Sequence, residues 1–266
     1  MFKTRLLSGI VLVAAALVLL ITGGEVLLAA LCMISLVGMY ELYRIYKMEQ
    51  TLAAAIAYGA TVLYYLDLYF QWIPHIMMYI LGLLTVLLAV YVLAYPKYHA
   101  SQIQALFFGV FYVAVMLSCI YQTRQMEKGA YIVWLIFLCS WGCDTCAYCV
   151  GVRFGKHKMS PVLSPKKSVE GAVGGLAGTF LLTALYGTVL QTQMDLTGAQ
   201  VYLMAAISVA GGLISMIGDL AASAIKRNYE IKDYGNLIPG HGGILDRFDS
   251  VIFTAPIIYY LIKYLL

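Results

Sequence analysis

Nine stretches of about 20 residues, apolar almost throughout, dominate this 266-residue sequence. A helix needs about 20 apolar residues to cross a lipid bilayer. The apolar residues run continuously instead of alternating, which favours helices over the strands of a membrane barrel. The stretches begin near Leu6, Val26, Leu52, Ile73, Ile103, Ala130, Gly171, Gln200 and Val251.

Composition supports a membrane protein, because 62% of the residues are hydrophobic, only 11% are charged and the mean hydropathy is +0.86. A soluble globule of this length could not bury so much apolar surface. We therefore predict an all-α, polytopic membrane helix bundle of about nine transmembrane helices. The first stretch follows Lys3 and Arg5 and resembles a signal peptide, but no clear cleavage site follows it, so a retained helix is favoured.

The distribution of Lys and Arg predicts the orientation, because cytoplasmic loops carry the excess of these residues. If the N-terminus is cytoplasmic, 14 of the 17 basic residues lie on the cytoplasmic side. The exceptions are Arg124, Lys128 and Lys263. We therefore expect a cytoplasmic N-terminus and, in a bacterium, an integral protein of the inner (cytoplasmic) membrane whose active site faces the cytoplasm.

Polar residues divide the chain into two predicted regions. Residues 1–129 are interpreted as an N-terminal transmembrane scaffold of about five helices. Within it, Glu41 with Arg44 at a helix end, and Asp67 among tyrosines, are typical of a membrane interface. Residues 130–266 are interpreted as a catalytic transmembrane region with two cytoplasmic loops, 152–170 and 224–249, because most acidic and basic residues are concentrated there.

Two aspartates, Asp144 and Asp219, fall inside predicted spans. Inserting an aspartate at the centre of a span costs about 2.5 to 3.5 kcal/mol, so such a residue is a functional candidate with a partner. Both spans are predicted to run towards the cytoplasm, and each aspartate precedes the end by one or two turns. We therefore expect the two carboxylates at similar depth. Helical spacing places Asp219 on one face with Ser215, Ser223, Lys226 and Arg227.

The first loop ends in the order Ser-Pro-Lys-Lys-Ser-x-Glu-Gly directly ahead of a predicted helix. Its Lys166, Lys167 and Ser168 would converge with backbone N–H groups at the helix N-terminus, which is a typical anion site. Attraction of the basic loop to anionic lipid headgroups is the alternative interpretation.

The second loop contains Pro-Gly-His-Gly-Gly at 239–243, a run that cannot continue a helix and that lets the backbone approach a ligand closely. Asp246 and Asp249 follow, three residues apart, at the start of the last span. Carboxylates flanked by Lys and Arg suit a Mg²⁺–polyphosphate site, because oxygen ligands hold the metal and cations neutralise the remaining phosphate charge.

These motifs resemble the phosphatidate cytidylyltransferase family, also called CDP-diacylglycerol synthases. Its signature, S-x-hydrophobic-K-R, four residues, K-D, a turn, P-x-H-G-G, hydrophobic, x-D-R, hydrophobic, D, is met without a gap from Ser223 to Asp249. A second similar block runs from Asp144 to Gly171. The resemblance covers a little under half of the chain, at its C-terminal end.

The resemblance implies CTP and phosphatidic acid as substrates, CDP-diacylglycerol and pyrophosphate as products, one or two Mg²⁺ ions, the lipid bilayer as partner and no nucleic acid. Asp219 and Asp246 are the first expected metal ligands, followed by Asp249 and Asp144. The expected catalytic residues are Asp219, Asp246, Lys226 and His241, where His241 is either a general base or a residue of the turn that contacts phosphate. The expected substrate-binding residues are Lys166, Lys167, Ser168, Ser223, Arg227, Lys232 and Arg247.

Other functions fit parts of the pattern. A CTP-dependent lipid kinase needs the same Mg²⁺ and phosphate groups, and it would release CDP instead of pyrophosphate. A transporter could also contain buried acids, but no inverted repeat of the charged segments is visible. A CDP-alcohol phosphotransferase is disfavoured because its D-G-x-x-A-R…G-x-x-x-D-x-x-x-D pattern is missing.

Small residues in two predicted spans have structural interpretations. Four cysteines in the sixth span lie along one helical stripe and are interpreted as packing residues in preference to a metal cluster: Cys139, Cys143, Cys146 and Cys149. Four glycines in the seventh span permit close helix packing, either within one chain or between two chains of a homo-oligomer: Gly171, Gly174, Gly175 and Gly178.

Overall fold

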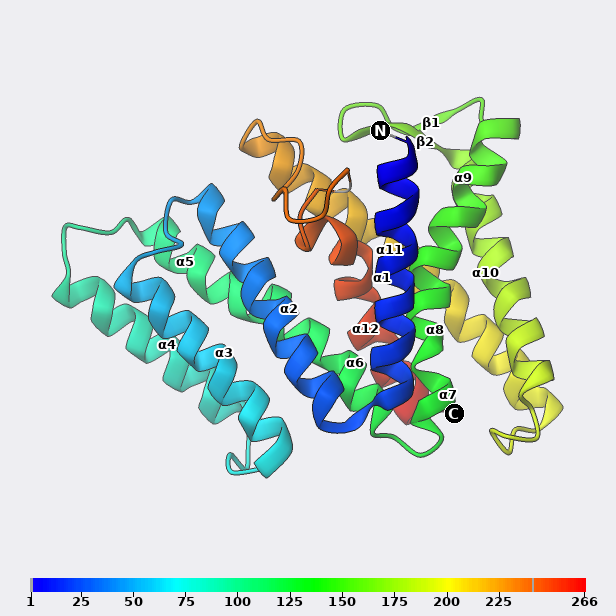
Figure 1. Ribbon diagram of the computed structural model, residues 1–266, viewed down its shortest axis with the longest axis horizontal. Helices are drawn as coiled ribbons and strands as arrows, with labels where there is room; N and C mark the ends of the chain where they lie inside the picture. Colours follow the sequence, from blue (N-terminus) through cyan, green and yellow to red (C-terminus); the bar gives the residue numbers. More distant parts are fainter. Residues whose placement is uncertain (1, 241) are drawn as a thin grey trace. The chain divides into compact units, whose positions relative to one another are not determined.

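The computed structural model of the protein describes residues 2–240 and 242–266, with side chains from residue 8 onward. Most of this described chain is helical (Figure 1). Among the described residues, eight helices are long and apolar enough to cross a membrane, and a shorter apolar stretch, Ser8–Thr22, lies in the first helix. The predicted all-α, polytopic bundle is confirmed, and the protein is an integral membrane protein. The orientation of its N-terminus stays a prediction.

The chain forms two compact units that do not follow the order of the sequence. The first unit contains the residues up to Ser118 together with the later segment Asp233–Asp246. The second unit contains Cys119–Lys232 and Arg247–Leu266. Each unit is therefore built from two separate pieces of the chain.

The first unit is a group of helices in which sequence neighbours pack side by side (Figure 1). Thr51 begins one of them by accepting a hydrogen bond from the Ala54 N–H at 3.2 Å, which satisfies an N–H group that the helix itself cannot pair. The elements are α1 (Phe2–Thr22), α2 (Gly24–Ile45), α3 (Leu52–Phe70), α4 (Ile76–Leu93), α5 (Ala100–Gly109) and the π-helical segment η1 (Val110–Val115).

Buried tyrosines cross-link these helices. Tyr43 donates a hydrogen bond to the Leu106 carbonyl at 2.6 Å. Tyr64 lies 2.9 Å from the Ser118 hydroxyl, and Tyr65 lies 2.8 Å from the Ser35 hydroxyl. Tyr64 and Tyr65, two of the tyrosines near Asp67, are buried inside the helix bundle and serve its packing.

The second unit carries most of the charged residues. Its span from Gly129 to Phe154 contains a π-helical segment, which widens the helix just ahead of Asp144. Strands β1 and β2 form an antiparallel hairpin in the loop that follows. The elements are α6 (Met116–Arg124), α7 (Gly129–Ile132), α8 (Trp134–Phe137), η2 (Leu138–Gly142), α9 (Cys143–Phe154), β1 (Lys158–Ser160), β2 (Ser164–Ser168), α10 (Val169–Val189), α11 (Gly198–Asn228) and α12 (Leu245–Leu265). The first residues of α6 and of α12 belong to the first unit.

Glycines allow α10 to approach α9 closely within this chain. A Cβ atom at Gly174 would lie 2.5 Å from a methyl group of Val150, and one at Gly178 would lie 2.5 Å from the Cys146 sulfur. The glycine stripe thus serves packing inside one chain, as one of the two sequence interpretations expected. Cys139 and Cys143 are fully buried, which fits the packing interpretation of the cysteine stripe.

The helix boundaries differ from the sequence expectation around the second loop. Helix α11 continues to Asn228, and α12 begins at Leu245, about two turns before the expected Val251. Residues 224–228 and 245–249 are therefore helical and not part of a loop. A helix can extend beyond its apolar stretch where its charged residues are paired or reach the membrane surface, so hydropathy alone places such ends poorly.

We expect Gly174→Leu to destabilise the protein, because the new side chain would overlap Val150 and overpacking costs about 1 to 3 kcal/mol. Thermal unfolding in detergent should show a lower midpoint for this variant. Gly82→Leu on α4 is the matched control, since a Cβ there meets no atom within 4 Å. Equal midpoints for the two variants would contradict the close α9–α10 packing.

Candidate active site

A cavity of about 620 Å³ in the second unit brings together residues from α9, the β1–β2 hairpin, α10 and α11. Asp144 and Asp219 both line it, as expected from the similar depth predicted for them. Apolar side chains form much of the remaining wall. The cations that line the cavity are Lys158, Lys166 and Lys167, and the apolar residues include Ala147, Val152, Met159 and Met216.

An ion pair between Lys167 and Asp219 crosses this cavity wall and joins β2 to α11. Both side chains are 25% exposed, so the pair is neither fully solvated nor sealed off. An ion pair in such a position is stronger than one on an open surface, because water screens it less. Each charge therefore stabilises the other at the place where a charged ligand could enter.

Further charges surround this pair and form what we call the acid–cation cluster: Asp144, Asp219, Asp249, Lys167, Lys226 and Arg247. The charges of Lys167, Asp219 and Arg247 act on Asp144. Asp249 is 9% exposed, and the charges of Asp219 and Lys226 act on it. The three negative and three positive charges of the cluster cancel one another. A polyphosphate and its divalent cation, which also carry opposite charges, could therefore be neutralised in this part of the second unit.

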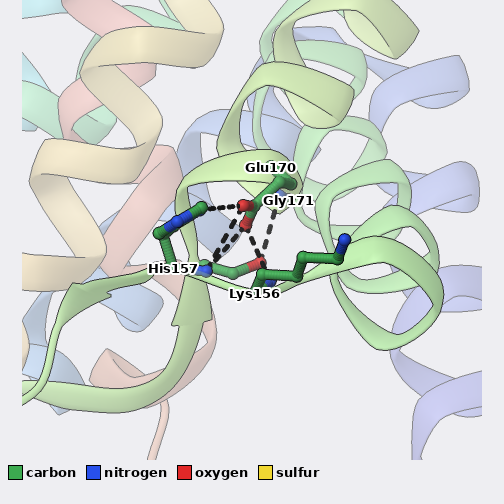
Figure 2. A network of polar contacts seen from close by, with 5 residues as sticks. Lys156, His157, Glu170 and Gly171 are labelled. Carbon is green, nitrogen blue, oxygen red and sulfur yellow. Dashed lines mark hydrogen bonds and ion pairs between the residues drawn. The ribbon is translucent and has the colours of Figure 1, made fainter.

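Glu170 fixes the base of the hairpin that supplies the lysines. Its carboxylate accepts hydrogen bonds from the backbone N–H groups of Lys156 and His157, at 3.0 and 3.2 Å, and pairs with the His157 ring at 2.5 Å. Figure 2 shows these contacts converging on one side chain at the start of α10. The carboxylate also lies in the first helical turn, where the helix dipole favours negative charge. The hairpin is therefore attached to α10 at both of its ends.

Ser168 caps α10 and lies against two glycines at the end of α9, Gly151 and the C-cap residue Gly155. Its hydroxyl accepts a hydrogen bond from the Gly171 N–H at 3.1 Å. A Cβ at Gly155 would lie 2.6 Å from the same hydroxyl, and one at Gly151 would lie 3.1 Å from it. Ser168 thus lines the cavity and also holds the helix start, so its expected contact with substrate comes in addition to a structural role.

Asp246 belongs to the first unit, where it shapes the loop that precedes it. It is 5% exposed, and its Oδ2 accepts hydrogen bonds from the N–H groups of Tyr234 at 2.7 Å and Gly243 at 3.0 Å. Gly242 has a φ of 85°, a conformation that favours glycine. One oxygen of this expected metal ligand is therefore already committed to the backbone.

Glu41 of α2 is a residue whose importance sequence reasoning missed. Its two carboxylate oxygens accept hydrogen bonds from the N–H groups of Ile244, at 3.0 Å, and Leu245, at 2.9 Å. It is 4% exposed, so protein surrounds its carboxylate, which the sequence interpretation of a membrane-interface residue did not anticipate. A carboxylate within a predicted spanning helix was the available signal. Its proximity to a helix end made an interfacial position the more ordinary interpretation.

The remaining expected site residues lie along the end of α11 and in the loop after it. Ser223 and Lys226 are half-buried on α11, whereas Arg227 and Lys232 are exposed. The structure does not place these four in the wall of the cavity. His241 lies outside the described residues.

Carboxylate oxygens that could bind a metal ion are present, but they do not form a complete set of protein ligands. Among the described residues, no group of three or more His, Cys, Asp or Glu side chains could hold a metal ion. Mg²⁺ is commonly bound by only one or two carboxylates, with water and substrate phosphates completing its coordination. Asp219 with a neighbouring carboxylate of the acid–cation cluster fits that pattern.

Membrane-spanning helices around a cavity that holds acids and several lysines are an arrangement that suits the polytopic membrane enzymes that act on phosphate-bearing substrates. Residues 3–265 match the sequence model of the Cytidylyltransferase family, and the chain belongs to that family. It is therefore a nucleotidyltransferase.

Three relatives that are similar to this chain along nearly their whole length share the name phosphatidate cytidylyltransferase. The phosphatidate cytidylyltransferase of Synechocystis is 32% identical over 300 residues, covering 98% of this chain and 97% of the relative. Those of Staphylococcus saprophyticus and Staphylococcus epidermidis are 30% and 31% identical, each covering 96% of this chain and 97% of the relative. The resemblance inferred from the motifs is thereby confirmed.

We expect Glu170→Gln to loosen the hairpin, because an amide keeps the shape but loses the charge that strengthens its hydrogen bonds to Lys156 and His157. Hydrogen exchange followed by mass spectrometry should show faster exchange in residues 156–169. Glu127→Gln, a carboxylate outside the hairpin, serves as the control. Unchanged exchange in the hairpin would show that Glu170 does not hold it.

Proposed function

We propose that this protein is a phosphatidate cytidylyltransferase, which transfers the cytidylyl group of CTP to phosphatidic acid and releases CDP-diacylglycerol and pyrophosphate. The observation that carries the proposal is the Lys167–Asp219 pair in a cavity that offers lysines for phosphate and apolar wall for lipid. Membership of the Cytidylyltransferase family and the names of the full-length relatives support the choice of both substrates.

In this reaction a phosphate oxygen of phosphatidic acid attacks the α-phosphorus of CTP. A new P–O bond forms, the bond between the α-phosphorus and the bridging oxygen breaks, and pyrophosphate leaves with the electron pair. A phosphate monoester has a second pKa near 6, so it is mostly a dianion at neutral pH and needs no strong general base. The protein then contributes positioning and neutralisation of charge.

The cations of the cavity would bind and orient the phosphates. Lys158, Lys166 and Lys167 line it from a hairpin that Glu170 holds in place. A phosphate oxygen can replace Asp219 as the partner of Lys167, which releases that carboxylate for a cation. Arg247 and Lys226, which act on Asp144 and Asp249, would neutralise further phosphate charge.

Mg²⁺, one ion or two, would neutralise the triphosphate and favour departure of pyrophosphate. Asp219 would hold it, with Asp144 or Asp249 as the second carboxylate. Asp246 stays a candidate ligand, although its Oδ2 already accepts two backbone hydrogen bonds. The acids also keep the lysines charged and in place before substrate arrives.

The active site would face the cytoplasm, where CTP is made. The excess of Lys and Arg in the segments around the hairpin supports this orientation. The membrane would then be the inner membrane in a bacterium, and phosphatidic acid would reach the cavity from the cytoplasmic leaflet.

We expect a cysteine introduced at Val162 in the hairpin to be protected from a membrane-impermeant thiol reagent in intact cells, and to react once the cells are permeabilised. Val162 is well exposed, so accessibility within the protein is not limiting. A cysteine at Asp195, between α10 and α11, should react from outside and is the matched control. The reverse pattern, measured above the background of the native thiols, would show the opposite orientation.

We expect Asp219→Asn to lower kcat for CDP-diacylglycerol formation by about 100-fold or more, because the amide neither holds a cation nor balances Lys167. Labelled CTP and phosphatidic acid give the rate, and the released nucleotide or pyrophosphate identifies the reaction. Release of CDP by the parent would instead indicate a lipid kinase.

The control for this prediction is Asp195→Asn, which removes an exposed aspartate that pairs with Lys128. It should keep the parental rate. Asp195→Asn should extract and unfold like the parent, because its ion pair is exposed. Asp219→Asn leaves Lys167 without its partner and should unfold at a somewhat lower temperature, so kcat is measured below that transition. Near-parental turnover with an unchanged Mg²⁺ requirement in Asp219→Asn would contradict the assigned role.

A further inference from the structure

In the segment Asp233–Asp246, which holds the Pro-Gly-His-Gly-Gly run, the described residues have little regular structure of their own. Its only described backbone pairing of the sheet type is an isolated bridge between Ile238 and Gly242, with an N–H to carbonyl distance of 2.9 Å. Loops without internal pairing keep one conformation only if other groups hold them. The groups that hold this segment include the side chains of Glu41 and Arg44 of α2 and of Asp246. Ser8 of α1 also donates a hydrogen bond to the Pro239 carbonyl at 3.1 Å.

Glu41 holds the C-terminal end of the segment. Its carboxylate accepts from the N–H groups of Ile244 and Leu245, which stand at the start of α12 and have no partner within that helix. The N-terminus of a helix favours a negative charge. Few other partners could offset the cost of burying this carboxylate in a membrane-spanning helix.

Two glycines make room for the Glu41 carboxylate. A Cβ atom at Gly235 would lie 2.2 Å from its Oε1, and a Cβ atom at Gly243 would lie 2.4 Å from the same oxygen. Sequence reasoning interpreted the glycine run as room for a ligand. At Gly243 the group that approaches the backbone is a side chain of this protein.

The N-terminal end of the segment is held at Tyr234. Arg44 Nη2 donates a hydrogen bond to the Tyr234 carbonyl at 2.7 Å, and Asp246 Oδ2 accepts from the Tyr234 N–H at 2.7 Å. Asp246 also accepts from Gly243, so it ties the two ends together. We call Glu41, Arg44 and Asp246 the loop clamp.

We propose that Glu41 is a positioning residue for cytidylyl transfer, which acts by holding the segment 233–246 and the start of α12 in a single conformation. This proposal rests on the proposed function. Glu41 does not need to touch a reacting atom, because its effect passes through the backbone that it binds. Asp246, an expected metal ligand, follows directly after Leu245 and belongs to the same unit, so the same contact helps to fix its place.

A carboxylate gives this contact a direction that packing alone would not give. An apolar side chain of similar volume could fill the space at a lower desolvation cost. It would leave two N–H groups unpaired and would not define where the backbone lies. Misplacement by about 1 Å can lower an enzymatic rate about 100-fold, so a group that defines backbone position can matter to catalysis from a distance.

The test is Glu41→Gln in the full-length protein, followed by hydrogen exchange and by steady-state kinetics with CTP and phosphatidic acid. The amide has one acceptor oxygen for two N–H groups and turns its own NH₂ towards the other. Hydrogen exchange of the backbone amides in residues 233–246 should become about tenfold faster or more. The exchange rates in the rest of the chain should not change. The kcat should fall about tenfold to 100-fold, with little change in KM for CTP.

Two further variants make the result specific. Gly243→Ala displaces the same carboxylate from the loop side, so it should reproduce both the local exchange and the fall in kcat. Glu25→Gln removes an exposed carboxylate from the same helix and should change neither. Because Gly243→Ala leaves Glu41 intact, it also tests the proposal if Glu41→Gln does not fold.

Parental exchange in 233–246 for Glu41→Gln and Gly243→Ala would overturn the clamp. Faster exchange there with parental kcat would overturn the positioning role, and faster exchange throughout the chain would show a general structural role instead. Failure of the proposed function looks different, because the parent protein itself would then make no CDP-diacylglycerol from CTP and phosphatidic acid.

Discussion

A charge placed in a membrane-spanning helix must find its partner within the protein, because lipid offers none. The two units meet this constraint in different ways. Asp219 is paired with a side chain, Lys167, and a phosphate group can take over such a partner. Glu41 is paired with the backbone N–H groups of Ile244 and Leu245, which no soluble ligand displaces easily. The first arrangement suits binding and exchange, whereas the second suits a fixed geometry.

The features that the sequence predicted well are those with a local signal. A run of about 20 apolar residues is contained in a short window, so the spans were found close to their true positions. Asp144 and Asp219 could be brought to the same depth by counting spans, and they line one cavity. The start of α12 at Leu245 was missed because the charged residues after it interrupt the apolar window.

The features that the sequence did not predict depend on contacts between distant residues. The β1–β2 hairpin contains Pro165 and shows no alternation of apolar residues, and it is held by Glu170 beyond its end. Glu41 accepts from residues 203 and 204 positions further along the chain. In sequence it is one acid near a helix end, a position that most often means contact with lipid headgroups and water.

The assignment of Asp233–Asp246 to the first unit has a consequence for how the protein is made. A chain emerging from the ribosome completes its N-terminal parts first, and domains generally fold as they become complete. Here the first unit cannot be completed until nearly the whole chain has been synthesised. Until then, Glu41 is already within the bilayer region without its N–H partners. During biogenesis the N-terminal helices therefore remain incomplete until the segment after α11 has been synthesised.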